Sequence, residues 1–172
     1  MKNLLSARIN ITQELVSKLV CEFTNGTENA GQFLVIMHGT DKVILQMEKP
    51  IYDVDEIALH LDDVRHNLKE TVIQFKIGEV ATKNKLMKPL IGVLKSKLLS
   101  WFLQKSGSVR LPSGIVVSVN GEIIQLEIRK WLENTNIGAL EFAVVGKLID
   151  TIEIVSAQID EAELVVETKI VG

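Results

Sequence analysis

The chain contains a single cysteine, Cys21, among its 172 residues. One cysteine permits neither an internal disulfide nor a metal site built from cysteine ligands. Cys21 falls within a predicted helix that follows Thr12, and we expect a buried, unreactive thiol on the apolar side of that helix.

Aromatic residues are also scarce, at 5% of the chain against 47% for hydrophobic residues as a whole. The core must therefore be aliphatic, and so apolar a composition excludes an intrinsically disordered chain. Proteins that bind single-stranded nucleic acid use aromatic side chains as stacking platforms, and most nucleic-acid-binding domains are basic. With a net charge of −3, this chain is not expected to bind nucleic acid.

Long hydrophobic runs are missing too. No uninterrupted run reaches the roughly 18 apolar residues that a membrane-spanning helix needs. Near the start, Lys2 is followed by only two leucines, Leu4 and Leu5, which falls short of the roughly 7–15 apolar residues of a secretory signal. The expected location is therefore the cytoplasm, with peripheral attachment to a membrane left open.

Sequence motifs of catalysis and of metal binding do not occur. The chain has no Gly-x-Ser-x-Gly turn, no His-Glu-x-x-His pair and no Walker A loop. His60 and His66 have several acidic neighbours, but the spacing is not that of a metal site and is typical of a solvated rim. We therefore expect no enzymatic activity, no cofactor and no metal ion.

The pattern of hydrophobic and polar residues predicts a mixture of strands and helices. A strand is predicted at 5–11, Thr12 then suits a helix N-cap, and the helix that follows has an apolar face (Leu15, Val16, Leu19, Val20 and Phe23). Further strands are predicted at 33–38, 42–48, 56–61 and 71–77, and residues 62–70 are predicted to form a charged loop or one helical turn. No Pro-, Gly- or Ser-rich linker divides the chain, so we expect a single domain over 1–172.

The last third is predicted to be almost entirely β. Asn120-Gly121 is the strongest hairpin signal of the chain and joins predicted strands at 115–119 and 122–128. Residues 129–134 are expected to form a short turn of helix. Three more strands are predicted at 139–145, 148–156 and 163–170.

One long stretch of the chain has no acidic residue. Between Val80 and Gly121 there are six lysines and one arginine, whereas the other 130 residues hold 12 basic and 22 acidic ones. An apolar segment flanked only by cations suits an anionic lipid surface or an acidic partner. This stretch is the strongest functional signal in the sequence.

The same stretch contains a predicted helix over residues 86–105. Its main apolar face comprises Met87, Leu90, Ile91, Leu94, Leu98, Trp101 and Phe102. Leu99 and Leu103 point nearly the opposite way, so they need a second packing partner. The helix therefore has three interpretations: a core element, a surface for lipid or another apolar ligand, and a protein interface.

A long apolar helix at 86–102 is followed by the segment Leu111-Pro112-Ser113-Gly114-Ile115-Val116-Val117-Ser118-Val119-Asn120-Gly121-Glu122-Ile123. Together with a helix after an N-terminal strand and several long hairpins, this order of elements resembles that of the tubular lipid-binding superfamily. The likeness extends over nearly the whole chain and rests on pattern, without a diagnostic motif. It implies an elongated domain that holds lipid or another apolar molecule between a long helix and a highly curved sheet.

The expected fold is α+β, with a long, curved, mostly antiparallel sheet wrapped around one long helix and one shorter N-terminal helix. The expected function is non-catalytic binding of a lipid or similar apolar ligand in a groove between the long helix and the sheet. The ligand would contact Val93, Leu94, Leu98, Leu99, Trp101, Phe102 and Leu103. An anionic head group or membrane surface would meet Lys95 and Lys97. The alternative is a structural or assembly protein whose strand edges and apolar helix contact a second copy or another protein.

Overall fold

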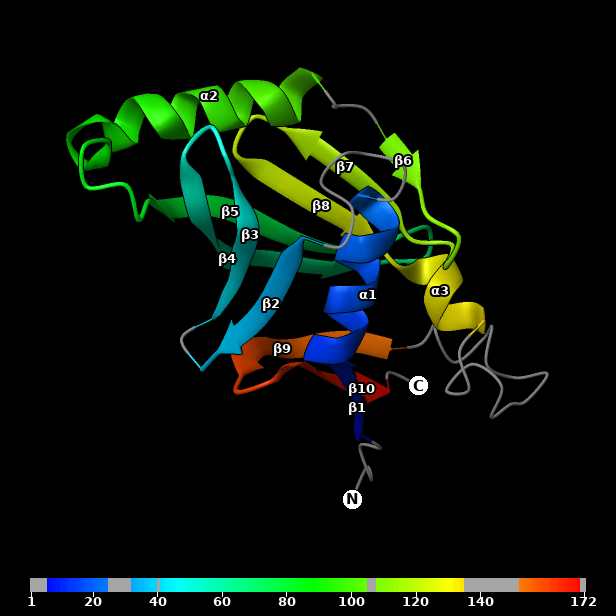
Figure 1. Cartoon of the computed structure of the whole chain (residues 1–172). Helices are drawn as coiled ribbons and strands as arrows, with labels where there is room; N and C mark the ends of the chain where they lie inside the picture. The colour runs from blue at the N-terminus through cyan, green and yellow to red at the C-terminus, as the bar shows by residue number, and fades with distance from the viewer. Residues whose placement is uncertain (1–5, 25–31, 40, 105–107, 135–151, 171–172) are drawn as a thin grey trace.

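The structure is a computed structural model, and it describes residues 6–24, 32–39, 41–104, 108–134 and 152–170; the side chains of residues 6–7, 102–104 and 134 are not described. The first half of the chain forms β1 (Ser6–Thr12), α1 (Gln13–Thr24), β2 (Phe33–His38), β3 (Lys42–Ile51), β4 (Val54–His66) and β5 (Thr71–Ala81). The second half forms the 3₁₀ turn η1 (Lys88–Leu90), α2 (Ile91–Gln104), β6 (Ser108–Arg110), β7 (Val116–Asn120), β8 (Ile123–Glu127), α3 (Arg129–Asn134), β9 (Ile152–Asp160) and β10 (Glu163–Ile170) (Figure 1).

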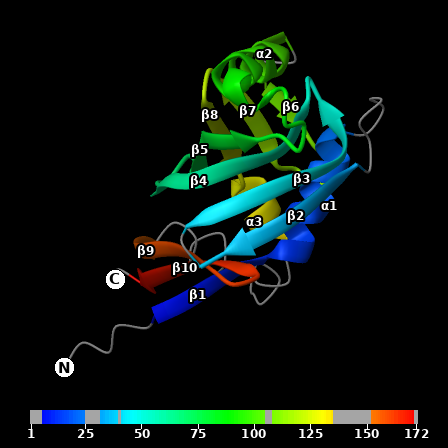
Figure 2. The same ribbon diagram turned by 60° about the vertical axis from the view of Figure 1, so that its left-hand side comes forward.

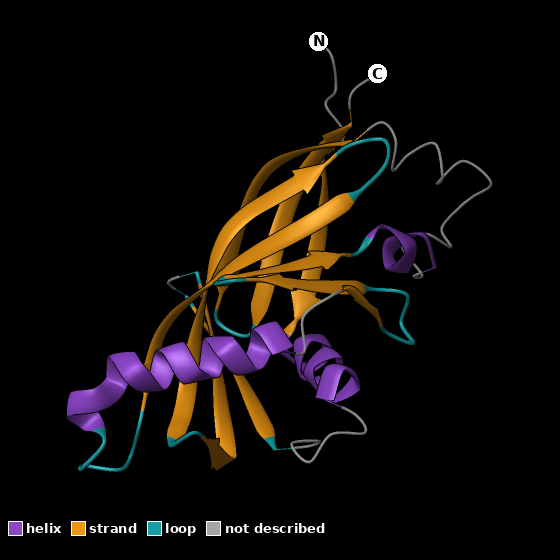
Figure 3. Ribbon diagram, turned by 90° about the horizontal axis from the view of Figure 1, so that it is seen from above, coloured by secondary structure: helices purple, strands orange, loops and turns teal. Residues whose placement is uncertain are grey.

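All strand pairs in the described part of the chain are antiparallel, so the predicted α+β class with a mostly antiparallel arrangement is confirmed. The strands form two sheets, where one long sheet was expected. A three-stranded sheet has the order β1-β10-β9, and a seven-stranded sheet has the order β2-β3-β4-β5-β8-β7-β6 (Figure 2). Helix α2 lies across the strands of the larger sheet, where it contacts β4, β5 and β7 (Figure 3).

The two sheets share one hydrophobic core. Ile9, Val166 and Ile154 of the small sheet lie with Val64 and Ile73 of the large sheet around a narrow gap. The buried apolar side chains of both sheets, of α1 and of α2 belong to a single cluster. Because side chains alternate along a strand, this core takes every second residue of the strands that build it.

The opposite face of the large sheet carries a row of polar side chains across neighbouring strands. Gln74 of β5 donates from its side-chain amide to Asp62 Oδ2 of β4 at 2.6 Å, and Gln125 of β8 donates to Gln74 Oε1 at 2.7 Å. The hydroxyls of Ser108 and Ser118, on β6 and β7, lie 3.1 Å apart. The same face also holds Ile44, Ala58 and Val72, which are buried but lie outside the core cluster.

Asp41, in the turn between β2 and β3, ties that turn to both sheets. Its Oδ1 accepts a hydrogen bond from the backbone N–H of Ile159 in β9 at 2.7 Å. Its carbonyl oxygen accepts one from the backbone N–H of Leu61 in β4 at 2.9 Å. Its φ of 56° lies in the left-handed region, which aspartate tolerates better than most residues.

The structure differs from the sequence-based prediction in two described segments. Residues 62–66 continue β4, where a loop or helical turn was predicted, because Val64 and Arg65 pair with Ile73 and Val72 of β5. Cys21 is exposed, so the expectation of a buried thiol was wrong. On α1 it lies about 165° from the centre of the apolar face, at 100° per residue. The strand predicted at 139–145 and the beginning of that at 148–156 lie outside the described residues.

Candidate functional site

Helix α1 begins at a cap that its sequence predicts. The hydroxyl of Thr12 accepts a hydrogen bond from the backbone N–H of Leu15 at 3.2 Å, as expected of an N-cap. The side-chain oxygen of Gln13 accepts another from the backbone N–H of Met37 in β2 at 2.9 Å, which fixes the start of α1 against the edge of the large sheet. With that end held, the helix turns Val16, Leu19, Val20 and Phe23 toward the sheet.

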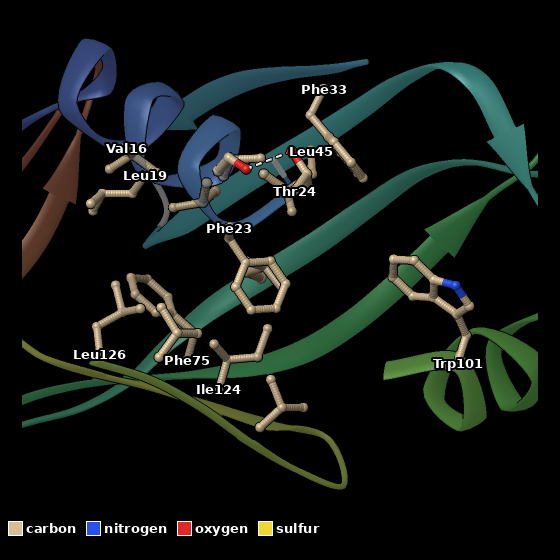
Figure 4. Close-up of a pocket in the computed structure, with 15 residues that line it drawn as sticks. Val16, Leu19, Phe23, Thr24, Phe33, Leu45, Phe75, Trp101, Ile124 and Leu126 are labelled. Atoms are coloured by element: carbon tan, nitrogen blue, oxygen red, sulfur yellow. Dashed lines mark hydrogen bonds between the residues drawn. The ribbon is translucent and has the colours of Figure 1, made fainter. Parts of the chain in front are cut away.

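The sheet beneath α1 presents the alternate residues of five strands. They are Val43 and Leu45 of β3, Leu59 of β4, Phe75 of β5, Val117 and Val119 of β7, and Ile124 and Leu126 of β8. Phe33 of β2 closes one side and Trp101 of α2 closes another (Figure 4). Helices α1 and α2 therefore cover the same face of the sheet.

Between these walls lies a cavity of about 110 Å³ that is partly open to the outside of the fold. The surface that its lining residues present to the interior is entirely apolar. Thr24 is the single lining residue with a hydroxyl, and its Oγ1 donates to the carbonyl oxygen of Val20 at 2.8 Å. A cavity with no polar group to hold water favours an apolar occupant.

Half of the aromatic side chains of the chain surround this cavity. The sequence has five phenylalanines, two tryptophans and one tyrosine, and Phe23, Phe33, Phe75 and Trp101 are among the lining residues. In Figure 4 these rings approach the same space from α1, β2, β5 and α2. Aromatic rings contribute large apolar contact area at low conformational entropy, as ligand sites require.

Of the residues predicted on sequence to line a ligand site, Trp101 is the one that reaches this cavity. Leu94 and Leu98 are 1% and 0% exposed and lie in the core. Leu99 is half-buried and packs against the same core, so it does not point away from the fold as the sequence-based wheel suggested. Val93 is 52% exposed on the outer side of α2. The side chains of Phe102 and Leu103 lie outside the described ones.

The two predicted head-group lysines differ in their surroundings. Lys95 Nζ lies 3.4 Å from Glu122 Oε1, with both side chains partly exposed. Lys97 is exposed and forms no ion pair with the described residues. Glu122 therefore partly neutralises the charge of Lys95, whereas the charge of Lys97 is available to a partner.

Titratable groups do not gather at the cavity. His60 Nε2 and Glu79 Oε2 lie 2.7 Å apart on the surface, and the hydrogen bond from His60 holds the pKa of Glu79 below its ordinary value. His66 Nδ1 lies 2.7 Å from the hydroxyl of Thr71. Among the described residues, no three His, Cys, Asp or Glu side chains are grouped so that they could hold a metal ion.

Comparisons with protein-family models, with curated proteins and with solved structures found no match. None of the helices in the described ranges combines the length and apolar character needed to cross a membrane. The case for a function therefore depends on the cavity and on the surface of the molecule.

Apart from Trp101, the residues that line the cavity were not predicted from the sequence as a binding site. The apolar face of α1 was predicted correctly, and its last member is Phe23, a large ring at the end of a short helix. In a chain with so few aromatics, the positions of its rings were the one available signal. That signal does not show which rings meet, because they come from separate parts of the chain.

Proposed function

We propose that this protein is a non-catalytic binding protein for a lipid or a similar apolar ligand, which it holds in the cavity between α1 and the large sheet. The observation that carries the proposal is a cavity of about 110 Å³ whose inner surface is entirely apolar. Natural cores are close-packed and rarely leave such space. The distribution of the aromatic rings, four of which border the cavity, supports the same reading.

The volume limits the size of the ligand. A dry apolar cavity of about 150 Å³ accepts benzene in a well-studied lysozyme variant, so about 110 Å³ suits a group of that size or slightly smaller. The ligand is a small apolar molecule, or the terminal part of one acyl chain inserted end first. An occupant is stabilised by the apolar surface that it removes from water, at about 25 cal/mol per Å².

The proposed function includes the finer architecture implied by the resemblance to the tubular lipid-binding superfamily, in which a sheet curves around a long helix. Its support is that α2 crosses β4, β5 and β7 on the apolar face of the sheet and contributes Trp101 to the cavity. In our proposal α1 and α2 enclose the ligand together. The site is therefore centred on α1, and α2 forms one wall.

The test uses one position on α1 in two opposite variants. Val20→Phe places a ring in the cavity and should lower affinity for a fluorescent short-chain fatty acid at least tenfold. Val20→Ala enlarges the same space and should retain binding, although it removes two methyl groups and costs about 1.6 kcal/mol of stability or more. Val119→Phe, which enters from β7, repeats the filling experiment if Val20→Phe fails to fold.

Tryptophan fluorescence provides a second readout. Trp101 lines the cavity, whereas Trp131 lines a different, smaller gap near α3. In a Trp131→Phe chain, ligand binding should therefore change the emission of Trp101 alone. Absence of any probe binding by the wild-type chain, or equal binding by the filled and enlarged variants, contradicts the proposed function.

A further inference from the structure

The outer side of α2 carries an exposed apolar stripe that the cavity does not use. Leu86, in the turn before η1, is 86% exposed, Leu90 at the end of η1 is 47% exposed, and Val93 in the first turn of α2 is 52% exposed. Lys97 continues the same side of the helix, because residues at spacings of three and four align along a helix. We call Leu86, Leu90, Val93 and Lys97 the α2 ridge.

The ridge faces away from the core. Leu94 and Leu98, on the inner side of the same helix, are fully buried. They pack α2 against the described fold, whereas the ridge residues do not. The other exposed positions on the outer side of α2 are small and uncharged: Gly92, Ser96 and Ser100. In Figure 1, α2 lies along one border of the molecule, with the strands on a single side of it.

The charged residues of the chain segment that carries the ridge are all basic. Lys83, Lys85, Lys88 and Lys97 are exposed, and none of the four forms an ion pair with the described residues. No acidic residue occurs between Val80 and Gly121. Glu122, just beyond this stretch, pairs with Lys95, and the carboxylate of Asp55 accepts a hydrogen bond from the backbone N–H of Lys83. The uncompensated lysines nearest the ridge are therefore Lys85, Lys88 and Lys97.

We propose that the α2 ridge docks on the surface of an anionic lipid bilayer. The helix would lie in the plane of the interface, with Leu86, Leu90 and Val93 among the upper acyl carbons and the lysines at the level of the head groups, as amphipathic interfacial helices do. The three apolar ridge side chains are exposed on a helix at the border of the molecule, an arrangement that suits a broad fluid surface. The cationic border of the ridge matches the negative potential of an anionic leaflet.

Docking would also serve the proposed binding function, although it does not depend on it. Trp101 lies on the inner side of the helix that carries the ridge and lines the cavity. A bilayer held against the outside of α2 is therefore one helix away from the cavity. This part of the proposal rests on the proposed function, whereas binding to the bilayer can be measured without any ligand.

The experiment measures sedimentation of the full chain with vesicles of phosphatidylcholine alone and of phosphatidylcholine with phosphatidylserine at three to one. We expect binding to the anionic vesicles only, with loss of binding as salt is raised. Each lysine near an anionic surface contributes about fivefold to the partition coefficient. The triple variant Lys85→Gln, Lys88→Gln, Lys97→Gln should therefore bind about a hundredfold more weakly.

Matched controls come from other exposed positions. Lys18, Lys49 and Lys69 are exposed, and their joint replacement by glutamine removes the same net charge but should change binding much less than the ridge variant. Leu90→Ser with Val93→Ser should weaken binding at least tenfold, whereas Leu68→Ser, at a leucine that is 71% exposed, should have no effect. Both ridge variants should still bind the soluble fatty-acid probe.

Three outcomes overturn the proposal. The first is that the wild-type chain does not bind the anionic vesicles. The second is that the control lysine variant loses as much binding as the ridge variant, which would indicate a general effect of net charge. The third is self-association of the wild-type chain that Leu90→Ser abolishes, which would assign the ridge to a second copy. The filled cavity variant Val20→Phe should retain vesicle binding, so failure of one proposal does not imply failure of the other.

Discussion

Replacing Asp41 by alanine should destabilise the protein by about 2.5–5 kcal/mol. The carboxylate of Asp41 accepts the backbone N–H of Ile159 at 2.7 Å, and removal of a hydrogen bond to a charged group costs about 1.5–3 kcal/mol. Asp41 also has a φ of 56°, a left-handed conformation that costs alanine about a further 1–2 kcal/mol. The two effects arise from different atoms, so different substitutions can separate them.

Two further substitutions at the same position serve as controls. Asp41→Asn keeps a side-chain oxygen and tolerates the positive φ, so we expect a loss of at most about 1.5 kcal/mol. Asp41→Gly removes the hydrogen bond but adopts the positive φ freely, so its stability should lie between those of the asparagine and alanine variants. Each variant retains the backbone carbonyl that accepts from Leu61.

Urea unfolding followed by circular dichroism measures these differences. With a slope of about 2 kcal/mol per molar urea, Asp41→Ala should lower the midpoint by about 1–2.5 M. Equal midpoints for the alanine and asparagine variants would show that the contact with Ile159 contributes nothing. A glycine variant less stable than the alanine variant would refute the argument from φ.

Three other predictions concern α2 and the pair formed by His60 and Glu79. Leu98→Ala should lower the free energy of unfolding by about 2–5 kcal/mol, because Leu98 is fully buried. Val93→Ala, on the outer side, should lower it by less than about 0.5 kcal/mol. Equal losses, measured by urea unfolding, would mean that α2 is wrongly oriented. Gly78→Ala should destabilise the fold because the ring of His60 occupies the space of the added Cβ. Adding His60→Ala in the same chain should restore most of the lost stability. If stability is not restored, the contact between Gly78 and His60 is contradicted. The pKa of Glu79 is lowered in the folded protein, mainly by the hydrogen bond with His60. The ionised Glu79 carboxylate therefore stabilises the fold fully above the ordinary glutamate pKa. This stabilisation is lost as pH falls through the lower folded-state pKa. Between about pH 5 and pH 3, the free energy of unfolding in urea should therefore depend slightly less on pH for Glu79→Gln than for the wild type. Identical pH dependence in the two proteins would contradict this prediction.

The elements that the sequence predicted correctly depend on local signals. The cap at Thr12 involves a backbone amide three residues away. The hairpin predicted at Asn120-Gly121 forms one residue further on: Asn120 pairs with Ile123, and the two loop residues are Gly121, with a φ of 61°, and Glu122. In both cases the interaction that decides the conformation lies within a few residues of the signal. Such features can be predicted without knowledge of the rest of the fold.

The extension of β4 depends on a distant partner and was missed for that reason. Asp62 lies on the polar face, where it accepts from Gln74 on the neighbouring strand. The register of β4 against β5 also shifts twice, between Ile57 and Leu59 and between Leu61 and Asp63. Each irregularity interrupts the alternation from which a strand is predicted. A charged segment with broken alternation has the appearance of a loop until its partner is known.

The orientation of α2 was only partly predictable. A helical wheel assumes 100° per residue throughout, but Leu90 belongs to a 3₁₀ turn, which advances by about 120° per residue. The wheel placed Leu90 on the buried face and Leu99 on the outer one. In the structure Leu90 is exposed, and Leu99, within α2 itself, packs against the core. A helical wheel could not locate the cavity, because its walls come from two helices and six strands.

Membrane binding by the helix at 86–105 conflicts with a role in the core if both use the same apolar residues, since a residue cannot fill a core and enter a bilayer. In the structure the two tasks fall to different residues of one helix. Leu94 and Leu98 are buried, and Leu99 and Trp101 pack against the core, with Trp101 also lining the cavity. The ridge side chains Leu86, Leu90 and Val93 remain exposed. Substitutions on the outer side should therefore change attachment to a bilayer at constant stability, whereas substitutions on the inner side should change stability first. That separation is what distinguishes a docking helix from one that merely covers a sheet.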